Sequence, residues 1–152
     1  MKYLLIFLFL FSANIMANDV ESRRKQIVKI IDEEIFEIKR LSSQKRNKPD
    51  FMLRLAELNL EKARLWREKE NADYLKLPEK VRRKAVKSRY FRKSSSFFKI
   101  ANNLCLKIVN RFKKYPRIGE AYYILGFNAK EENKQKLASK YLARASKKTR
   151  SK

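Results

Sequence analysis

The sequence contains no histidine, two glycines, three prolines and one cysteine. Without histidine, the chain lacks the commonest general base and the commonest metal ligand of proteins. Gly119 and Gly126 are the only glycines, so a glycine-rich phosphate-binding loop is excluded as well. Cys105 has no partner for an intrachain disulfide, and its place in an apolar pattern indicates a small buried side chain. These shortages predict a protein that is not an enzyme, with no metal site and no cofactor.

The shortage of turn-forming residues also bears on the fold. Lysine, glutamate, leucine, isoleucine and alanine dominate the composition and favour helices throughout. The sequence therefore predicts an all-α protein without a sheet. Because one modest domain is the default for a chain of this length, we expect a single helical domain over residues 18–146.

The first residues have the three-part layout of a secretory signal. Lys2 supplies a positive charge, residues 3–11 form an apolar run, and a stretch of small and polar residues ends at Ala17. The apolar run is about half of the roughly 20 residues that a membrane-spanning helix needs, so an uncleaved anchor is the weaker interpretation. We predict cleavage after Ala17 and export to the periplasm.

Apolar periodicity predicts six helices after this signal. The stripe of the first, over residues 20–43, consists of Ile27, Ile31, Ile35, Ile38 and Leu41. Pro49 separates it from a second helix that starts near Asp50, its expected cap, and remains periodic to Trp66. The other four helices are expected over residues 78–93, 97–112, 118–129 and 134–146. We expect a cap or a break in the helix before the fourth of these, at Ser94, Ser95 and Ser96. Residues 147–152 are expected to form a disordered basic tail.

Large and small residues follow a fixed spacing near the C-terminus. The positions concerned are Tyr122, Leu125, Gly126, Ala138, Leu142 and Ala145, preceded by Pro116. This spacing resembles a tetratricopeptide repeat, in which small residues allow two antiparallel helices to approach and large residues fill the remaining space. Residues 52–63 also resemble a first repeat helix, similar to those of exported tetratricopeptide proteins of predatory and gliding bacteria. The resemblance implies antiparallel helix pairs stacked as a short α-solenoid.

The same resemblance implies a function. Tetratricopeptide helix pairs receive protein or peptide partners in the groove between them, so the chain is expected to be a non-catalytic adaptor of the cell envelope, within or capping a longer repeat array. The side chains expected to face the partner are Tyr122, Asn128, Lys134 and Tyr141.

Charge is distributed unevenly and supports an alternative. Residues 18–79 carry 15 basic and 13 acidic side chains, whereas residues 80–152 carry 23 basic and three acidic ones. The helix expected over residues 78–93 accounts for Lys80, Arg82, Arg83, Lys84, Lys87, Arg89, Arg92 and Lys93. Apolar residues lie between these cations, as in helices that bind anionic membrane or lipopolysaccharide surfaces. The alternative function is therefore a cationic protein that binds such surfaces through residues 80–93 and the basic tail, although a solvated charged face is the other interpretation. Nucleic acid is not an expected partner, because no recognised motif is present and we expect the chain to be exported.

Four acidic residues cluster within the first helix expected after the signal. Asp32, Glu33, Glu34 and Glu37 could hold a hard cation or act as an acid–base pair. Because they lie opposite the isoleucine stripe, the sequence predicts a solvated helix face instead.

Overall fold

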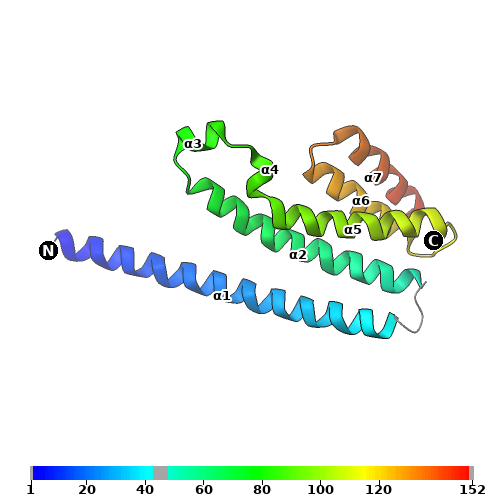
Figure 1. Cartoon of the computed structure of the whole chain (residues 1–152), viewed down its shortest axis with the longest axis horizontal. Coiled ribbons are helices and arrows are strands. Elements are labelled where there is room, and N and C mark those ends of the chain that lie inside the picture. The colour runs from blue at the N-terminus through cyan, green and yellow to red at the C-terminus, as the bar shows by residue number, and fades with distance from the viewer. Residues whose placement is uncertain (1, 43–47, 151–152) are drawn as a thin grey trace. The chain divides into compact units, whose positions relative to one another are not determined.

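The computed structural model describes the backbone of residues 2–42 and 48–150, and the side chains of residues 19–41, 48–86 and 88–148. Every regular element in these ranges is a helix and none is a strand, which confirms the predicted all-α class. The helices are α1 (Lys2–Ser42), α2 (Pro49–Leu75), α3 (Glu79–Lys84), α4 (Lys87–Tyr90), α5 (Arg92–Arg111), α6 (Ile118–Glu131) and α7 (Gln135–Arg150) (Figure 1). The chain divides into two compact units within α1, between Glu34 and Ile35.

Helix α1 is longer than expected. It begins at Lys2 instead of near residue 20, because no proline or glycine precedes Pro49 to interrupt it. Among the helices that the structure describes, none combines the length and apolar character needed to cross a membrane. Cleavage after Ala17 stays a prediction.

The two faces of α1 differ as the sequence predicted. Ile31, Ile35 and Ile38 are buried, although Ile27 and Leu41 at the ends of the stripe are exposed. Around them, Asp32, Glu33 and Glu37 are exposed and Glu34 is half-buried. Glu33 pairs with Lys29 and Glu37 with Arg40, both on the same helix. The acidic cluster is therefore a largely solvated face.

Four helices build the core of the second unit. Helix α2 packs on α5, α5 on α6 and α6 on α7, and consecutive members of this series run in opposite directions (Figure 1). Buried apolar side chains fill the space between them: Leu53, Ala56, Ala101, Cys105, Ile108, Ile124 and Leu125. Helix α2 is contacted on more than one side, which explains why its apolar residues occupy more than one face.

The helix expected over residues 78–93 is wrong. Ala85 (φ −76°, ψ 132°) and Val86 (φ −75°, ψ 102°) are extended and separate the short helices α3 and α4. No residue of α3 is buried, so tertiary packing does not stabilise a longer helix here. Neighbouring turns also repel each other through like charges at positions such as Lys80 and Lys84.

The serine break before the fourth helix is also wrong. Helix α5 begins at Arg92 and contains Ser94 as a fully buried residue. Glu70 of α2 accepts hydrogen bonds from the backbone N–H groups of Lys93 (2.8 Å) and Ser94 (3.3 Å) and from the Ser94 hydroxyl (2.5 Å). A carboxylate from another helix thus satisfies amides that a local cap would otherwise serve.

Asp50 is not the cap of α2, contrary to our expectation. Lys48 holds the cap position and Pro49 opens the first turn, where a missing N–H leaves no bond unmade. The Asp50 carboxylate instead accepts a 2.7 Å hydrogen bond from the Tyr115 hydroxyl. Burial and this bond raise the pKa of Tyr115 above its ordinary value, so its hydroxyl remains a donor at neutral pH.

Small residues let α6 and α7 approach closely. A Cβ atom at Gly126 would lie 2.7 Å from Leu142 Cγ and 3.2 Å from Leu142 N, so only glycine fits without a shift. Ala138 and Ala145 are buried on α7, and Leu125 on α6. The rings of Tyr122 and Tyr141 stack with centroids 6.2 Å apart. These contacts explain the residues selected by spacing, while membership of the tetratricopeptide family stays a prediction.

Helix α7 extends beyond the expected limit at residue 146. It continues to Arg150, so residues 147–150 are helical in the structure, whereas we expected a disordered tail; residues 151–152 lie outside the described range.

We expect α7 to open before α2. Of its described side chains only Ala138 and Ala145 are buried, and Leu137 is 39% exposed, whereas Leu53, Ala56 and other residues of α2 are fully enclosed. Local opening is easiest where few apolar groups are buried. Hydrogen exchange on the purified monomer should therefore be much faster for amides of residues 134–146 than for those of residues 52–66. Equal, strong protection of both segments would contradict this expectation.

Candidate functional site

An open groove runs between α2 and α6. Two adjoining depressions of about 350 and 490 Å³ form it and share Arg64. The first is lined by Glu57, Leu60, Glu61, Glu120, Tyr123 and Ile124. The second is lined by Arg67, Glu68, Phe98, Phe127 and Glu131. These residues with Arg64 define the α2–α6 groove, whose walls are two well-packed helices.

One face of α6 supplies a wall of the groove. Glu120, Tyr123, Phe127 and Glu131 follow each other at spacings of three and four, which places them along one side of the helix. Tyr123 is 54% exposed. Our sequence reasoning missed this face. The spacing of three and four can be read from the sequence and would have indicated this face. Glu120 and Glu131 are also two of only three acidic residues after position 79.

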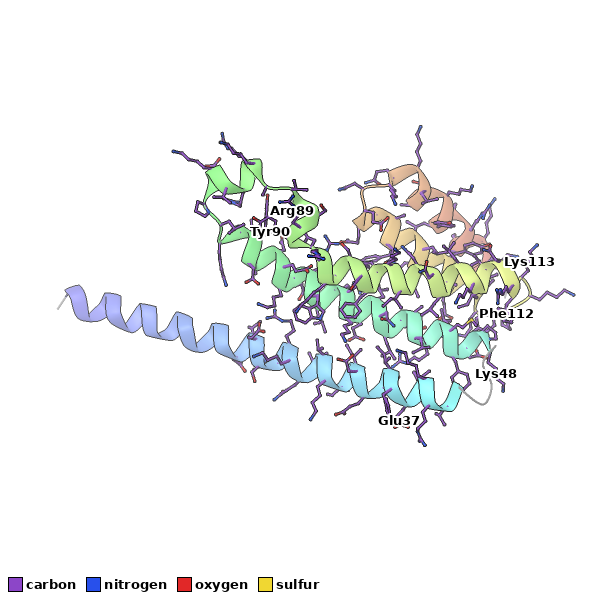
Figure 2. The ribbon with its side chains drawn as sticks, in the orientation of Figure 1. Glu37, Lys48, Arg89, Tyr90, Phe112 and Lys113 are labelled. Carbon is purple, nitrogen blue, oxygen red and sulfur yellow. The ribbon has the colours of Figure 1, made fainter. Side chains whose placement is uncertain are left out.

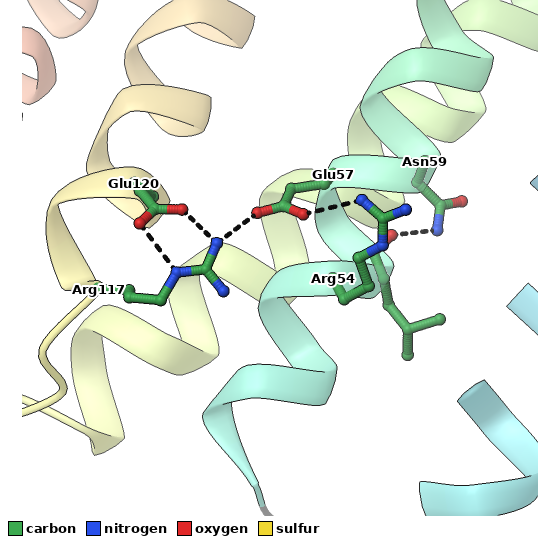
Figure 3. Close-up of polar contacts among 6 residues, drawn as sticks. Arg54, Glu57, Asn59, Arg117 and Glu120 are labelled. Carbon is green, nitrogen blue, oxygen red and sulfur yellow. Dashed lines mark hydrogen bonds and ion pairs between the residues drawn. The ribbon is translucent and has the colours of Figure 1, made fainter. Parts of the chain in front are cut away.

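Arg117 ties the two walls together at one end. Its guanidinium donates two hydrogen bonds to Glu120 (2.5 and 2.9 Å) and one to Glu57 (3.2 Å), which also accepts from Arg54 (3.3 Å) (Figure 3). The bonds to Glu120 raise the pKa of Arg117 above its ordinary value. Because solvent still reaches these side chains, the network orients the walls more than it stabilises them.

The remaining charges of the groove are of both signs. Within the part of the chain that the structure describes, Glu61, Glu68 and Glu131 have neither an ion pair nor a hydrogen bond through their side chains. The Arg64 guanidinium lies 4.5 Å from the centre of the Phe127 ring, and that of Arg67 lies 5.3 Å from the Phe98 ring. Such cation–π contacts hold the arginines beside the groove without neutralising them.

The side chains that we expected to face a partner do not gather in this groove. Asn128 is fully buried, where its Nδ2 donates to Asn102 Oδ1 (2.9 Å) and to the Phe98 carbonyl (3.4 Å), so its expected role is wrong. Tyr122 and Tyr141 are half-buried against each other. Lys134 lies just before α7 and pairs with Glu132.

The cations expected on one helix are distributed over three elements. Lys80, Arg82, Arg83 and Lys84 belong to α3, Lys87 and Arg89 to α4, and Arg92 and Lys93 to α5. Together with Val81, Ala85, Val86 and Tyr90 they form what we term the basic surface. The Lys87 side chain lies outside the described residues, and the Lys93 ammonium lies 4.1 Å from the centre of the Trp66 ring.

The basic surface contains an open depression of about 660 Å³. Its charged lining consists of Lys80, Arg83, Lys84 and Arg89, and its apolar lining of Val81, Ala85, Val86 and Tyr90. Glu79 pairs with Arg83 at the beginning of α3. Elsewhere on this surface, Arg82 is half-buried.

Tyr74 anchors the basic surface to the end of α2. Its ring meets that of Tyr90 edge-on at 5.4 Å and that of Phe91 at 5.8 Å, and its hydroxyl donates to the Arg82 carbonyl (3.0 Å). The Arg67 guanidinium also contacts this cluster, 4.8 Å from the centre of the Phe91 ring. Helix α3 has no buried residue of its own, so this aromatic cluster is what holds the segment in place.

Cys105 is buried in the core, as the sequence predicted. Burial, aided by the negative charge of Glu57, raises the pKa of its thiol to about 12. The thiol is therefore protonated at neutral pH and has little nucleophilic character.

Comparisons with known proteins found no match for this chain, whether among protein-family models, curated proteins or solved structures.

Proposed function

We propose that the chain is a non-catalytic adaptor of the cell envelope, which holds a segment of a partner protein in the α2–α6 groove. The observation that carries the proposal is the exposed Tyr123, which lies on a helix wall between Glu120 and Glu131, a carboxylate without a partner among the described side chains. Tyrosine and arginine dominate the binding energy of many protein interfaces, and this groove presents Tyr123 with Arg64 and Arg67.

The dimensions of the groove suit an extended peptide segment. Along α2 it reaches from Glu57 to Glu68, about 16 Å at the helical rise of 1.5 Å per residue. An extended chain covers that length with about five residues. Rigid helix walls also reduce the ordering cost of binding, because the receptor side is already formed.

Export and the repeat resemblance belong to the same proposal. A cleaved signal ending at Ala17 would deliver the adaptor to the periplasm, where partners in the envelope are accessible. Tetratricopeptide helix pairs use the groove between them for binding, and the close approach at Gly126 is consistent with that type of pairing.

Capture from envelope extracts with matched variants tests the adaptor function. The purified chain should retain a protein in a saturable manner at moderate salt, and Tyr123→Ala should weaken that complex by about 2 kcal/mol, roughly 30-fold in Kd. Ile100→Ala removes a comparably exposed side chain from α5, away from the groove lining, and should change Kd less than about twofold. Equal affinities of the two variants for the captured protein, or recovery of nothing but salt-eluted anionic material, would refute the proposal.

A further inference from the structure

We infer that the basic surface docks this protein on an anionic phospholipid bilayer, with Val81 and Val86 entering the headgroup region between the cationic side chains. The inference uses α3 and α4, which contribute nothing to the lining of the α2–α6 groove, and so it stands apart from the adaptor proposal.

Three apolar side chains of this surface are exposed. Val81 is 44% exposed, Val86 56% and Tyr90 36%, and all three line the same depression. Val86 lies in the extended break between α3 and α4. Exposed apolar residues gathered on one projecting segment indicate a binding surface more often than chance scatter.

Cations surround these valines. Lys80 and Lys84 flank Val81 on α3, and Arg89 precedes Tyr90 on α4. Glu79, the acidic residue of α3, pairs with Arg83, so its charge offsets one of several cations. Each lysine or arginine held close to an anionic bilayer increases partitioning about fivefold, so three or four of them suffice for a large preference.

The aromatic cluster fixes the segment in a docking position. Tyr74 contacts the rings of Tyr90 and Phe91 and bonds the Arg82 carbonyl, which holds α3 and α4 at the end of α2. Figure 2 shows Arg89 and Tyr90 near the start of α5, far from Phe112 and Lys113 at its other end. Tyr90 is partly exposed on this surface. Tyrosine is typical of membrane interfaces, because its ring prefers the apolar boundary and its hydroxyl group prefers water.

A bilayer satisfies both features of the surface, whereas a soluble polyanion satisfies one. Polyphosphate or the sugar phosphates of lipopolysaccharide would neutralise the cations but leave the valines in water. A lipid interface accepts apolar side chains a few ångströms below its phosphates, where the cations remain hydrated.

Vesicle flotation of the purified chain tests the charge requirement. Binding is expected to vesicles containing phosphatidylglycerol and not to pure phosphatidylcholine vesicles. Lys80→Gln/Lys84→Gln/Arg89→Gln should reduce partitioning about 100-fold, three factors of about five. The matched control, Lys99→Gln/Lys107→Gln/Lys113→Gln, removes the same net charge from exposed positions outside this surface and should reduce it less than about fivefold. Equal losses in the two triple variants would overturn the inference.

The apolar contribution needs its own variant. Val81→Ser/Val86→Ser changes no charge and removes side chains that are already exposed, so the fold is retained; partitioning should fall about tenfold. An unchanged affinity would reduce the surface to a simple polycation and overturn the inference.

A fluorescent label reports insertion directly. The Val86→Cys variant can be labelled selectively with nitrobenzoxadiazole, because Cys105 is buried. Its emission should shift to the blue and brighten on phosphatidylglycerol vesicles, while the same label at Asn103→Cys, on the exposed part of α5, should not change. Bound protein whose label at position 86 remains in water would overturn the inference.

Discussion

Replacing Phe98 with alanine is expected to lower the free energy of unfolding by about 3–5 kcal/mol. Phe98 is 2% exposed and is among the largest fully enclosed side chains of the described core. Its ring also lies under the Arg67 guanidinium, which would lose that contact. Because a domain of this size is typically stable by about 5–15 kcal/mol, the loss is a large share of the total.

Urea unfolding followed by circular dichroism measures this effect. Phe36→Ala is the matched control, because Phe36 is 66% exposed in the same unit and its removal should cost less than about 0.5 kcal/mol. Similar unfolding midpoints for the two variants would show that α5 does not pack as described.

Replacing Asn128 with aspartate is expected to destabilise the protein by at least about 3 kcal/mol at pH 7. The Asn128 side chain is fully buried and donates to Asn102 Oδ1 and the Phe98 carbonyl. A carboxylate of the same shape cannot donate to either oxygen, and it would place a negative charge between two acceptors. The exposed Asn103 on α5 provides the control, since Asn103→Asp makes the same chemical change in water.

The Asn128→Asp variant should also show a characteristic pH dependence. Burial raises the pKa of a carboxyl group in the folded state above its unfolded value. Such a group favours folding below the unfolded pKa and loses that contribution as the pH rises through the folded pKa. The stability difference from wild type should therefore narrow as the pH falls from 7 towards 4. A difference that stays constant over this range would mean that position 128 is solvated.

Much of the helical order could be predicted from residue patterns alone. The ends of α6 and the start of α7 agree with expectation within a few residues, because Pro116, the small residues and the apolar spacing act locally. The burial of Ile31, Ile35 and Ile38 and of Cys105 follows from the same periodicity. A stripe of this kind reports which face is apolar, whatever element covers it.

The two capping errors have a common origin in contacts between residues far apart in the sequence. Glu70 serves the first amides of α5 from a position 24 residues before Ser94, so the three serines looked like a break. Asp50 was expected to cap α2, but its carboxylate accepts a hydrogen bond from Tyr115, which lies 65 residues away in the sequence. Local capping rules consider only neighbours in the chain, and both carboxylates found partners on another element.

What the sequence determined by itself was the helical class, the unequal distribution of charge and the small residues that let α6 and α7 meet. The break at Ala85 and Val86, the burial of Asn128 and the groove between α2 and α6 were decided by tertiary structure. The physical reason is that helix propensity and periodicity depend on residues three or four positions apart, whereas these features depend on which helix packs beside which. Segment 78–93 had the composition of one helix, yet because α3 has no buried residue, residues 79–90 form the two short helices α3 and α4 beside Tyr74.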